Sequence, residues 1–167
     1  MTRIFLLLLV LLAGQSCGQS QEKQTGPEDL QHKTFMAKAI RIIDGDTMEV
    51  LYRGQSVRIR LTHIDSPERR RSQPFGKAAK QALSSLCHDQ EVTIVSEKYD
   101  RYGRLLAEVK NERGQIINQE MVKLGMAWHF KRYSSDTTYA HLEEEARRLK
   151  IGFWAENDSI IGLMWKQ

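Results

Sequence analysis

Cysteine is scarce in this chain of 167 residues, which contains only Cys17 and Cys87. Two cysteines allow at most one bridge, so a small fold held by a disulfide framework is excluded. The chain also lacks a set of Cys and His residues with the spacing of zinc ligands, which excludes a zinc-held fold. Cys87 falls within a helical pattern, where we expect a buried apolar thiol.

Apolar runs long enough to cross a bilayer, about 20 residues, are missing as well. A shorter apolar run covers residues 4–12, after a positive charge at Arg3 and before small and polar residues at 13–17. That order is typical of a secretory signal peptide. Residues 1–17 therefore predict an exported protein, which is secreted, periplasmic or lipid-anchored.

Two ways of processing the signal peptide stay open. Cys17 stands where a bacterial lipoprotein carries its lipidated cysteine, although Gly14 replaces the usual large aliphatic residue. Cleavage after Ser16 by an ordinary signal peptidase is the alternative. A lipid on Cys17 is the one membrane contact that we expect. Residues 18–34 are rich in polar residues and predict a solvated tether.

Neither sign of charge dominates, since 25 Lys and Arg face 21 Asp and Glu and leave a formal charge of +4. A modest positive balance favours a polyanionic partner but does not prove one. The remaining ~135 residues suit one compact domain. We place that domain at residues 35–155, followed by a C-terminal tail at 156–167, and nothing in the sequence demands more than a monomer.

Hydrophobic alternation predicts three consecutive strands over residues 35–43, 47–52 and 57–64. The turns Asp44-Gly45-Asp46 and Arg53-Gly54-Gln55 join them into a meander. A helix at 75–86, strands at 91–96 and 104–110, and helices at 117–127 and 136–150 follow, with Asn118 as an N-cap. The order predicts an α+β protein: a small, partly open, five-stranded OB-fold barrel with about three helices.

Polar residues gather in three clusters, at 44–47, 60–68 and 100–104. Each cluster alone is typical of a solvated turn, a helix cap or a charged loop. The meander, however, can bring the first two to the same end of the sheet, where Asp46 and Asp65 can converge. Two carboxylates repel each other unless a cation lies between them, and hard oxygen ligands suit Ca²⁺ or Mg²⁺.

Arginines complete this pattern. Arg60 lies near the end of the third predicted strand and Arg104 opens the fifth. A guanidinium presents a rigid fork of donors that matches phosphate oxygens. A divalent ion, two arginines and a further carboxylate are the parts needed to hydrolyse a phosphodiester.

The segments DGDT, RIRLTHIDSPE and DRYGRLLAEV, followed by GQIINQEMVKLGMAWHFKRY, resemble the staphylococcal nuclease family in the same order, from about residue 37 to residue 154. That family has an OB-fold barrel with helices and cleaves DNA and RNA with Ca²⁺. The resemblance implies a calcium-dependent nuclease, active on DNA and RNA, that leaves 3′-phosphorylated products.

The resemblance also implies roles for individual residues. Calcium would be bound by the carboxylates of Asp46 and Asp65 and the carbonyl of Ser66, with Asp44 supporting the site from behind these ligands. The catalytic residues would be Glu68, which orients or deprotonates the attacking water, and Arg60 and Arg104, which bind the phosphate. Substrate would be contacted by Tyr102 and Tyr133, and also by Lys131.

The chain departs from the family at a few positions. Lys131 stands where the type member has a second tyrosine, and Phe130 is an alternative platform. The loop after Glu68 is shorter and carries Arg69-Arg70-Arg71, which forms either a solvated loop or a phosphate-contacting arm. We expect His129 to be a packed or surface residue, not a general base.

Two other functions stay open. One is a non-catalytic OB-fold module that binds nucleic acid on an exported lipoprotein. The other is a calcium-stabilised lipoprotein that binds a protein. Binding alone requires a basic groove and aromatic platforms, not a carboxylate such as Glu68 that orients water. The nuclease is therefore the favoured hypothesis.

Overall fold

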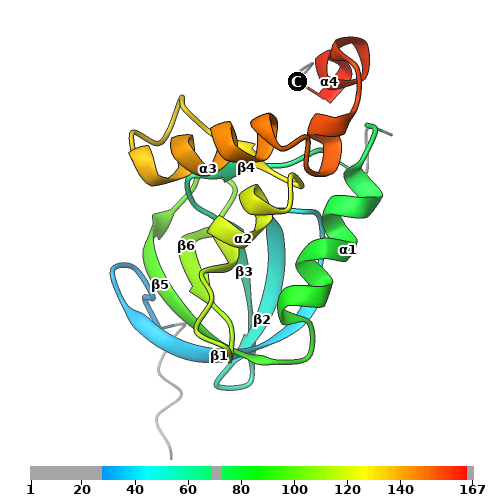
Figure 1. Ribbon diagram of the computed structural model, residues 1–167. Helices are drawn as coiled ribbons and strands as arrows, with labels where there is room; N and C mark the ends of the chain where they lie inside the picture. Colours follow the sequence, from blue (N-terminus) through cyan, green and yellow to red (C-terminus); the bar gives the residue numbers. More distant parts are fainter. Residues whose placement is uncertain (1–27, 69–72, 165–167) are drawn as a thin grey trace, which may run out of the picture.

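The computed structural model describes residues 28–68 and 73–164. Five strands form a closed barrel in the order β1-β2-β3-β6-β5 (Figure 1). They are β1 (Thr34–Ile42), β2 (Thr47–Tyr52), β3 (Gln55–Leu61), β5 (Glu91–Tyr99) and β6 (Leu105–Lys110). All pairings are antiparallel except that of β3 with β6, which is parallel and closes the barrel. The five-stranded α+β barrel is therefore confirmed, but it is closed, not partly open.

Helices cover one side and one end of the barrel. In Figure 1, α1 (Gly76–Cys87) runs along the side, while α2 (Ile117–Lys123) packs between the barrel and α3 (Thr137–Arg148). A 3₁₀ helix, η1 (Gly152–Ala155), and a short helix, α4 (Asp158–Met164), follow α3. The segment expected to be a C-terminal tail thus contains α4. Among the described residues, no helix is long and apolar enough to span a membrane.

The third predicted strand is shorter than expected and is followed by a second, smaller sheet. β3 ends at Leu61, and the chain resumes as β4 (Ile64–Asp65), which pairs antiparallel with β7 (Trp128–His129). His63, between β3 and β4, has a positive φ of 67°. This sharp change of direction takes Asp65 out of the barrel wall and toward the segment that follows α2.

The prediction that Asn118 caps a helix is wrong. Ile116 occupies the N-cap position of α2, and Asn118 is fully buried inside its first turn. Its Nδ2 donates to the carbonyls of Thr62 and Ala107, both at 3.1 Å, and its Oδ1 accepts the N–H of Val109 at 3.0 Å. Because a buried amide needs such partners, Asn118 joins α2 to the parallel seam between β3 and β6.

The barrel interior is the main core, and alternation along the strands supplies it. β6 shows the pattern most simply, since Leu105, Ala107 and Val109 point inward and are fully buried. Cys87 is also fully buried, as expected, and burial raises the pKa of its thiol to about 12. A second, smaller core lies under the C-terminal part and contains Trp128, Ala146, Phe153 and Trp154.

Two glycines join α2 to this second core. Gly125 and Gly152 both have a φ of +59°, and a Cβ on Gly125 would collide with the backbone carbonyl of Ile151. The carbonyl of Gly125 accepts the N–H of Phe153 at 3.1 Å. This close backbone contact leaves room only for glycine, which also explains why the predicted helix over 117–127 ends early, at Lys123.

We expect Gly125→Ala to destabilise the protein more than Gly114→Ala does. Gly114 has a φ of +75° but nothing within 4 Å of an added Cβ, so its replacement costs only backbone strain, about 1–2 kcal/mol. At Gly125 the steric conflict adds about 1–3 kcal/mol. Urea denaturation of both variants measures the difference, and equal losses would show that the glycine contact does not constrain the fold.

Candidate active site

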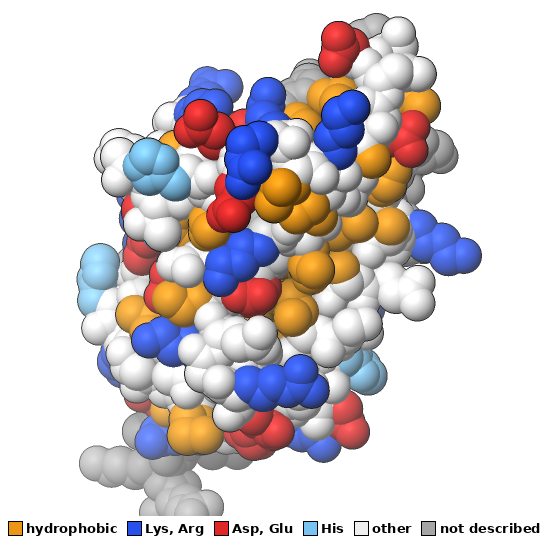
Figure 2. Space-filling view, viewed as in Figure 1, with side chains coloured by type: hydrophobic (Ala, Val, Ile, Leu, Met, Phe, Trp, Pro, Cys, Tyr) orange, Lys and Arg blue, Asp and Glu red, His pale blue; other side chains and the backbone are white. Residues whose placement is uncertain are grey.

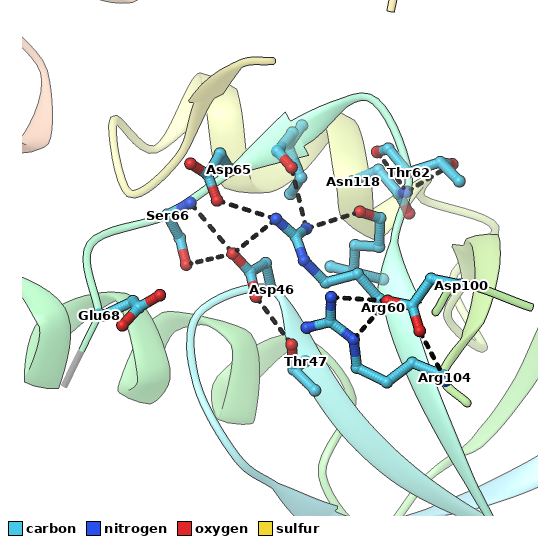
Figure 3. A network of polar contacts seen from close by, with 12 residues as sticks. Asp46, Thr47, Arg60, Thr62, Asp65, Ser66, Glu68, Asp100, Arg104 and Asn118 are labelled. Carbon is cyan, nitrogen blue, oxygen red and sulfur yellow. Dashed lines mark hydrogen bonds and ion pairs between the residues drawn. The ribbon is translucent and has the colours of Figure 1, made fainter. Parts of the chain in front are cut away.

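The first two polar clusters meet at one end of the barrel (Figure 3). Asp46 ends the turn between β1 and β2, and its carbonyl accepts the N–H of Leu61 at the end of β3, at 2.9 Å. Its Oδ2 accepts both the backbone N–H and the hydroxyl of Ser66, at 3.1 and 2.9 Å. Segments distant in sequence are thereby fixed side by side.

Arg60 lies at the centre of this arrangement and is 9% exposed. Its Nη1 donates to the carbonyls of Leu61 and Ile64, at 2.8 and 2.9 Å. Its Nη2 lies 2.8 Å from Asp65 Oδ1 and 3.2 Å from Asp46 Oδ2. The structure therefore brings Asp46 and Asp65 to the same guanidinium, whose two terminal nitrogens contact four protein oxygens.

The turn that carries Asp44 packs tightly against its surroundings. A Cβ on Gly45 would lie 2.6 Å from the Cβ of Ala79 on α1 and 2.8 Å from the hydroxyl oxygen of Ser66. Glycine therefore allows the turn to approach both. Oδ1 of Asp44 is buried and has no hydrogen-bond partner, which is costly unless a cation or water satisfies it.

These residues fit a hard divalent cation. Two carboxylates, those of Asp46 and Asp65, share one guanidinium, that of Arg60, which leaves an excess of negative charge. All donors are oxygens, as Ca²⁺ and Mg²⁺ prefer. Within residues 28–68 and 73–164, no group of three or more His, Cys, Asp and Glu side chains is close enough to hold a metal ion. Backbone oxygens or waters would have to complete the coordination.

Glu68 lies outside the network around Arg60. It follows Ser66 on the loop that leads to α1, and its backbone N–H donates to Gln73 Oε1 at 2.7 Å. Figure 3 shows the Glu68 side chain near Ser66 and Asp46, with no hydrogen bond drawn to them. The three arginines that follow it lie outside the described residues.

Arg104 is held by Asp100, which sequence reasoning left without a role. Asp100 Oδ2 accepts Nε and Nη2 of Arg104, both at 2.7 Å, and Asp100 Oδ1 accepts the backbone N–H groups of Tyr102 and Arg104, both at 2.9 Å. Burial opposes ionisation of Asp100, but these hydrogen bonds outweigh it and lower the pKa of its carboxyl. An Asp and an Arg four residues apart around the Tyr102-Gly103 turn are the sequence signal for this pair.

The expected substrate-contacting residues are exposed. Tyr102 and Tyr133 are 64% and 72% exposed, and the guanidinium groups of Arg101 and Arg132 lie 4.8 and 5.5 Å from the respective ring centroids. Lys131 is largely exposed and lies 3.5 Å from a carboxylate oxygen of Glu143. No contact ties these side chains to the carboxylate cluster in the described residues, although β7, just before them, pairs with the strand of Asp65.

Phe130 and His129 also have identifiable surroundings. The ring of Phe130 packs edge-on against Tyr133, with centroids 4.8 Å apart. His129 is buried, as expected of a packed histidine, and its Nε2 lies 3.0 Å from the hydroxyl of Ser134. Burial lowers the pKa of its imidazole. His129 therefore belongs to the wall behind β4 and not to the carboxylate cluster.

The positive charge is not gathered into one patch on the visible face. Figure 2 shows Lys and Arg side chains interspersed with Asp and Glu over this face. Individually placed cations, such as Arg104 and those of the Arg101–Tyr102 and Arg132–Tyr133 pairs, are groups that can attract a polyanion.

Comparisons with known proteins agree with this geometry. A family model described as staphylococcal nuclease homologue matches residues 58–156. An uncharacterized endonuclease of Haemophilus influenzae is 39% identical over 162 residues, which cover 96% of this chain and 82% of that protein. A micrococcal nuclease of Shigella flexneri is 38% identical over 143 residues, covering 80% and 81% of the two chains. A staphylococcal-like nuclease of Arabidopsis thaliana is 33% identical over 159 residues, covering 95% of this chain and 48% of that one.

We expect Arg60→Gln to lower the free energy of unfolding by about 3–5 kcal/mol, because it leaves two buried carboxylates without their counter-charge. Calcium at millimolar concentration should recover part of the loss by taking the place of the guanidinium. Arg58→Gln is the matched control, since Arg58 is exposed and forms an ion pair with Glu49 at 3.5 Å. Urea denaturation with calcium and with chelator tests this, and a loss below about 1 kcal/mol would contradict the central role of Arg60.

Proposed function

Since this chain belongs to the staphylococcal nuclease family, we propose that it is a nuclease that hydrolyses phosphodiester bonds of DNA and RNA with the help of Ca²⁺. The observation that carries the proposal is the meeting of Asp46, Arg60 and Asp65 at one end of the barrel. Carboxylates for a hard cation thus lie next to guanidinium groups that match phosphate. A module that only binds nucleic acid does not need this combination.

The carboxylates of Asp46 and Asp65 and the carbonyl of Ser66 would hold the cation. Asp44, whose Oδ1 is buried without a hydrogen-bond partner, would support the site from behind these ligands. The cation supplies positive charge that stabilises the phosphate in the transition state. Hydrogen bonds from Thr47 and Ser66 fix both oxygens of Asp46 before the cation arrives, at 2.8 and 2.9 Å.

Phosphate binding falls mainly to Arg104. A guanidinium has five N–H donors, and the Asp100 carboxylate uses two of those on Arg104. Three therefore remain to bind the oxygens of the phosphate and the charge that develops on them. The terminal nitrogens of Arg60 are already engaged with protein oxygens, which leaves its Nε for the substrate.

Glu68 is the proposed base. A carboxylate beside such a site can accept a proton from an attacking water, as general-base catalysis requires. Glu68 lies on the loop just beyond Ser66, on the Asp46 side of the network (Figure 3). Tyr102 and Tyr133 offer exposed rings on which bases can stack, without base-specific hydrogen bonds.

The proposal includes export and membrane anchoring, for which the amino-acid sequence is the only support. The signal peptide at 1–17 and its Cys17 lie outside the described residues. An extracytoplasmic nuclease, secreted, periplasmic or lipid-anchored, is the form we propose, acting as a monomer.

We expect the purified chain from residue 18 onward to cleave single-stranded DNA and RNA with Ca²⁺ and not with chelator. Glu68→Gln should lower turnover by about 10²-fold or more, because the base is lost while the charge of the cation remains. Glu144→Gln, an exposed carboxylate on α3, is the control and should cleave normally. Tight, salt-sensitive binding without cleavage would instead support the non-catalytic module.

The products distinguish this mechanism from other phosphodiester hydrolyses. Breaking the bond to the 5′ oxygen leaves a 3′-phosphate on one product and a 5′-hydroxyl on the other. We expect mass spectrometry of a cleaved oligonucleotide to show both. Products that carry 5′-phosphates would contradict the proposed direction of cleavage while leaving nuclease activity intact.

A further inference from the structure

Asp100 uses both of its carboxylate oxygens, and each serves a different part of the loop that follows β5. Oδ1 accepts the backbone N–H groups of Tyr102 and Arg104 and so shapes the turn. Oδ2 accepts Nε and Nη2 of Arg104 and so holds its side chain. The turn is closed further by the backbone N–H of Asp100, which donates to the carbonyl of Arg104 at 2.9 Å.

The side-on ion pair decides which edge of Arg104 is open. Asp100 occupies the edge formed by Nε and Nη2, so the edge formed by Nη1 and the second hydrogen of Nη2 is the one left for a phosphate. Figure 3 shows this guanidinium beside Thr47 and Arg60, with its open nitrogen directed toward the side of Asp46. The open edge therefore faces the carboxylate cluster.

Tyr102 restrains the same guanidinium from its face. The Tyr102 ring centroid lies 5.4 Å from the guanidinium carbon of Arg104 and 4.8 Å from that of Arg101. Asp100 also fixes the backbone N–H of Tyr102. An arginine side chain has many rotamers when free, and this arrangement removes much of that freedom before substrate binds.

We propose that Asp100 is a positioning residue for the nuclease reaction: it aims Arg104 at the scissile phosphate and fixes it there in advance. The inference rests on the proposed function, since it assigns Arg104 to the phosphate. Groups that are pre-aligned in this way pay no reorganisation cost during the reaction, and residues that orient such groups commonly account for about 10–100-fold in activity.

Asparagine at position 100 separates positioning from turn formation. Its Oδ1 can still accept the two backbone N–H groups, because asparagine forms the same kind of turn as aspartate. Its Nδ2 carries donors and cannot accept Nε and Nη2 of Arg104. Asp100→Asn therefore keeps the loop and releases the guanidinium. Asp29→Asn is the matched control, since Asp29 Oδ1 accepts the N–H of Gln31 at 3.0 Å in a comparable turn near the N-terminal end of the described residues.

The test is a double-mutant cycle with calcium and a short single-stranded oligonucleotide, read as kcat and KM. We expect Asp100→Asn to lower kcat by about 10–100-fold and Asp29→Asn to leave it unchanged. In an Arg104→Ala background, Asp100→Asn should change kcat by less than about 3-fold, because the group that it positions is gone. Urea denaturation should show that the Asp100→Asn fold is retained.

The outcomes are distinguishable. If the unmodified protein shows no calcium-dependent cleavage, the proposed function fails. If it cleaves but Asp100→Asn retains kcat, or if the loss is equally large without Arg104, the positioning role is overturned. NMR adds a readout that does not need activity: the Nε–H of Arg104 should exchange slowly with solvent in the unmodified protein and rapidly in Asp100→Asn.

Discussion

The structure depends on the burial of one positive charge between two negative ones. Arg60 would be costly to desolvate alone, and so would Asp46 and Asp65, yet each partner offsets the cost for the others. The guanidinium also takes the carbonyls of Leu61 and Ile64, so the end of β3 and the start of β4 close around it. The turn between β1 and β2 is drawn to the same point through Asp46. The same interaction therefore stabilises the fold and brings together the carboxylates of the candidate site.

The two arginines consequently do different work. The terminal nitrogens of Arg60 are occupied by protein oxygens and bring the two carboxylates to one guanidinium, while Arg104 keeps an open edge. In the proposed nuclease, two residues of the same type would thus divide structural and chemical duties. Such a division explains why one arginine is buried and the other reaches the site from an exposed loop. Both arginines have carboxylate partners: Asp46 and Asp65 pair with Arg60, and Asp100 pairs with Arg104.

Much of the fold and of the candidate site followed from local patterns in the sequence. Alternation located β2 from Thr47 to Tyr52, and the Asp-Gly turn located its hairpin with β1. What the sequence could not predict are contacts between distant segments. The local sequence predicts that Asn118 caps a helix, but its side-chain amide donates to the carbonyls of Thr62 and Ala107. Only the closed barrel brings these two residues together. The sequence shows Gly125 only as a residue that can end a helix. Glycine is required there because a Cβ would collide with the carbonyl of Ile151. Asp100 and Arg104 are only four residues apart, but a charged loop alone gives no sign of which edge of Arg104 the carboxylate occupies.

The parallel seam and the β4–β7 pairing carry a consequence for how the chain is made. The barrel cannot close before Ile59 of β3 pairs with Leu105 of β6. The strand that contains Asp65 has no partner before Asp65 pairs with Trp128. Contacts so distant along the chain form late, because the loop between them must first lose its freedom. A nascent chain that has not yet been synthesised to residue 128 therefore cannot pair the strand that carries Asp65. The end of the barrel where the carboxylates meet therefore gains its full set of strand pairings only when most of the polypeptide is complete.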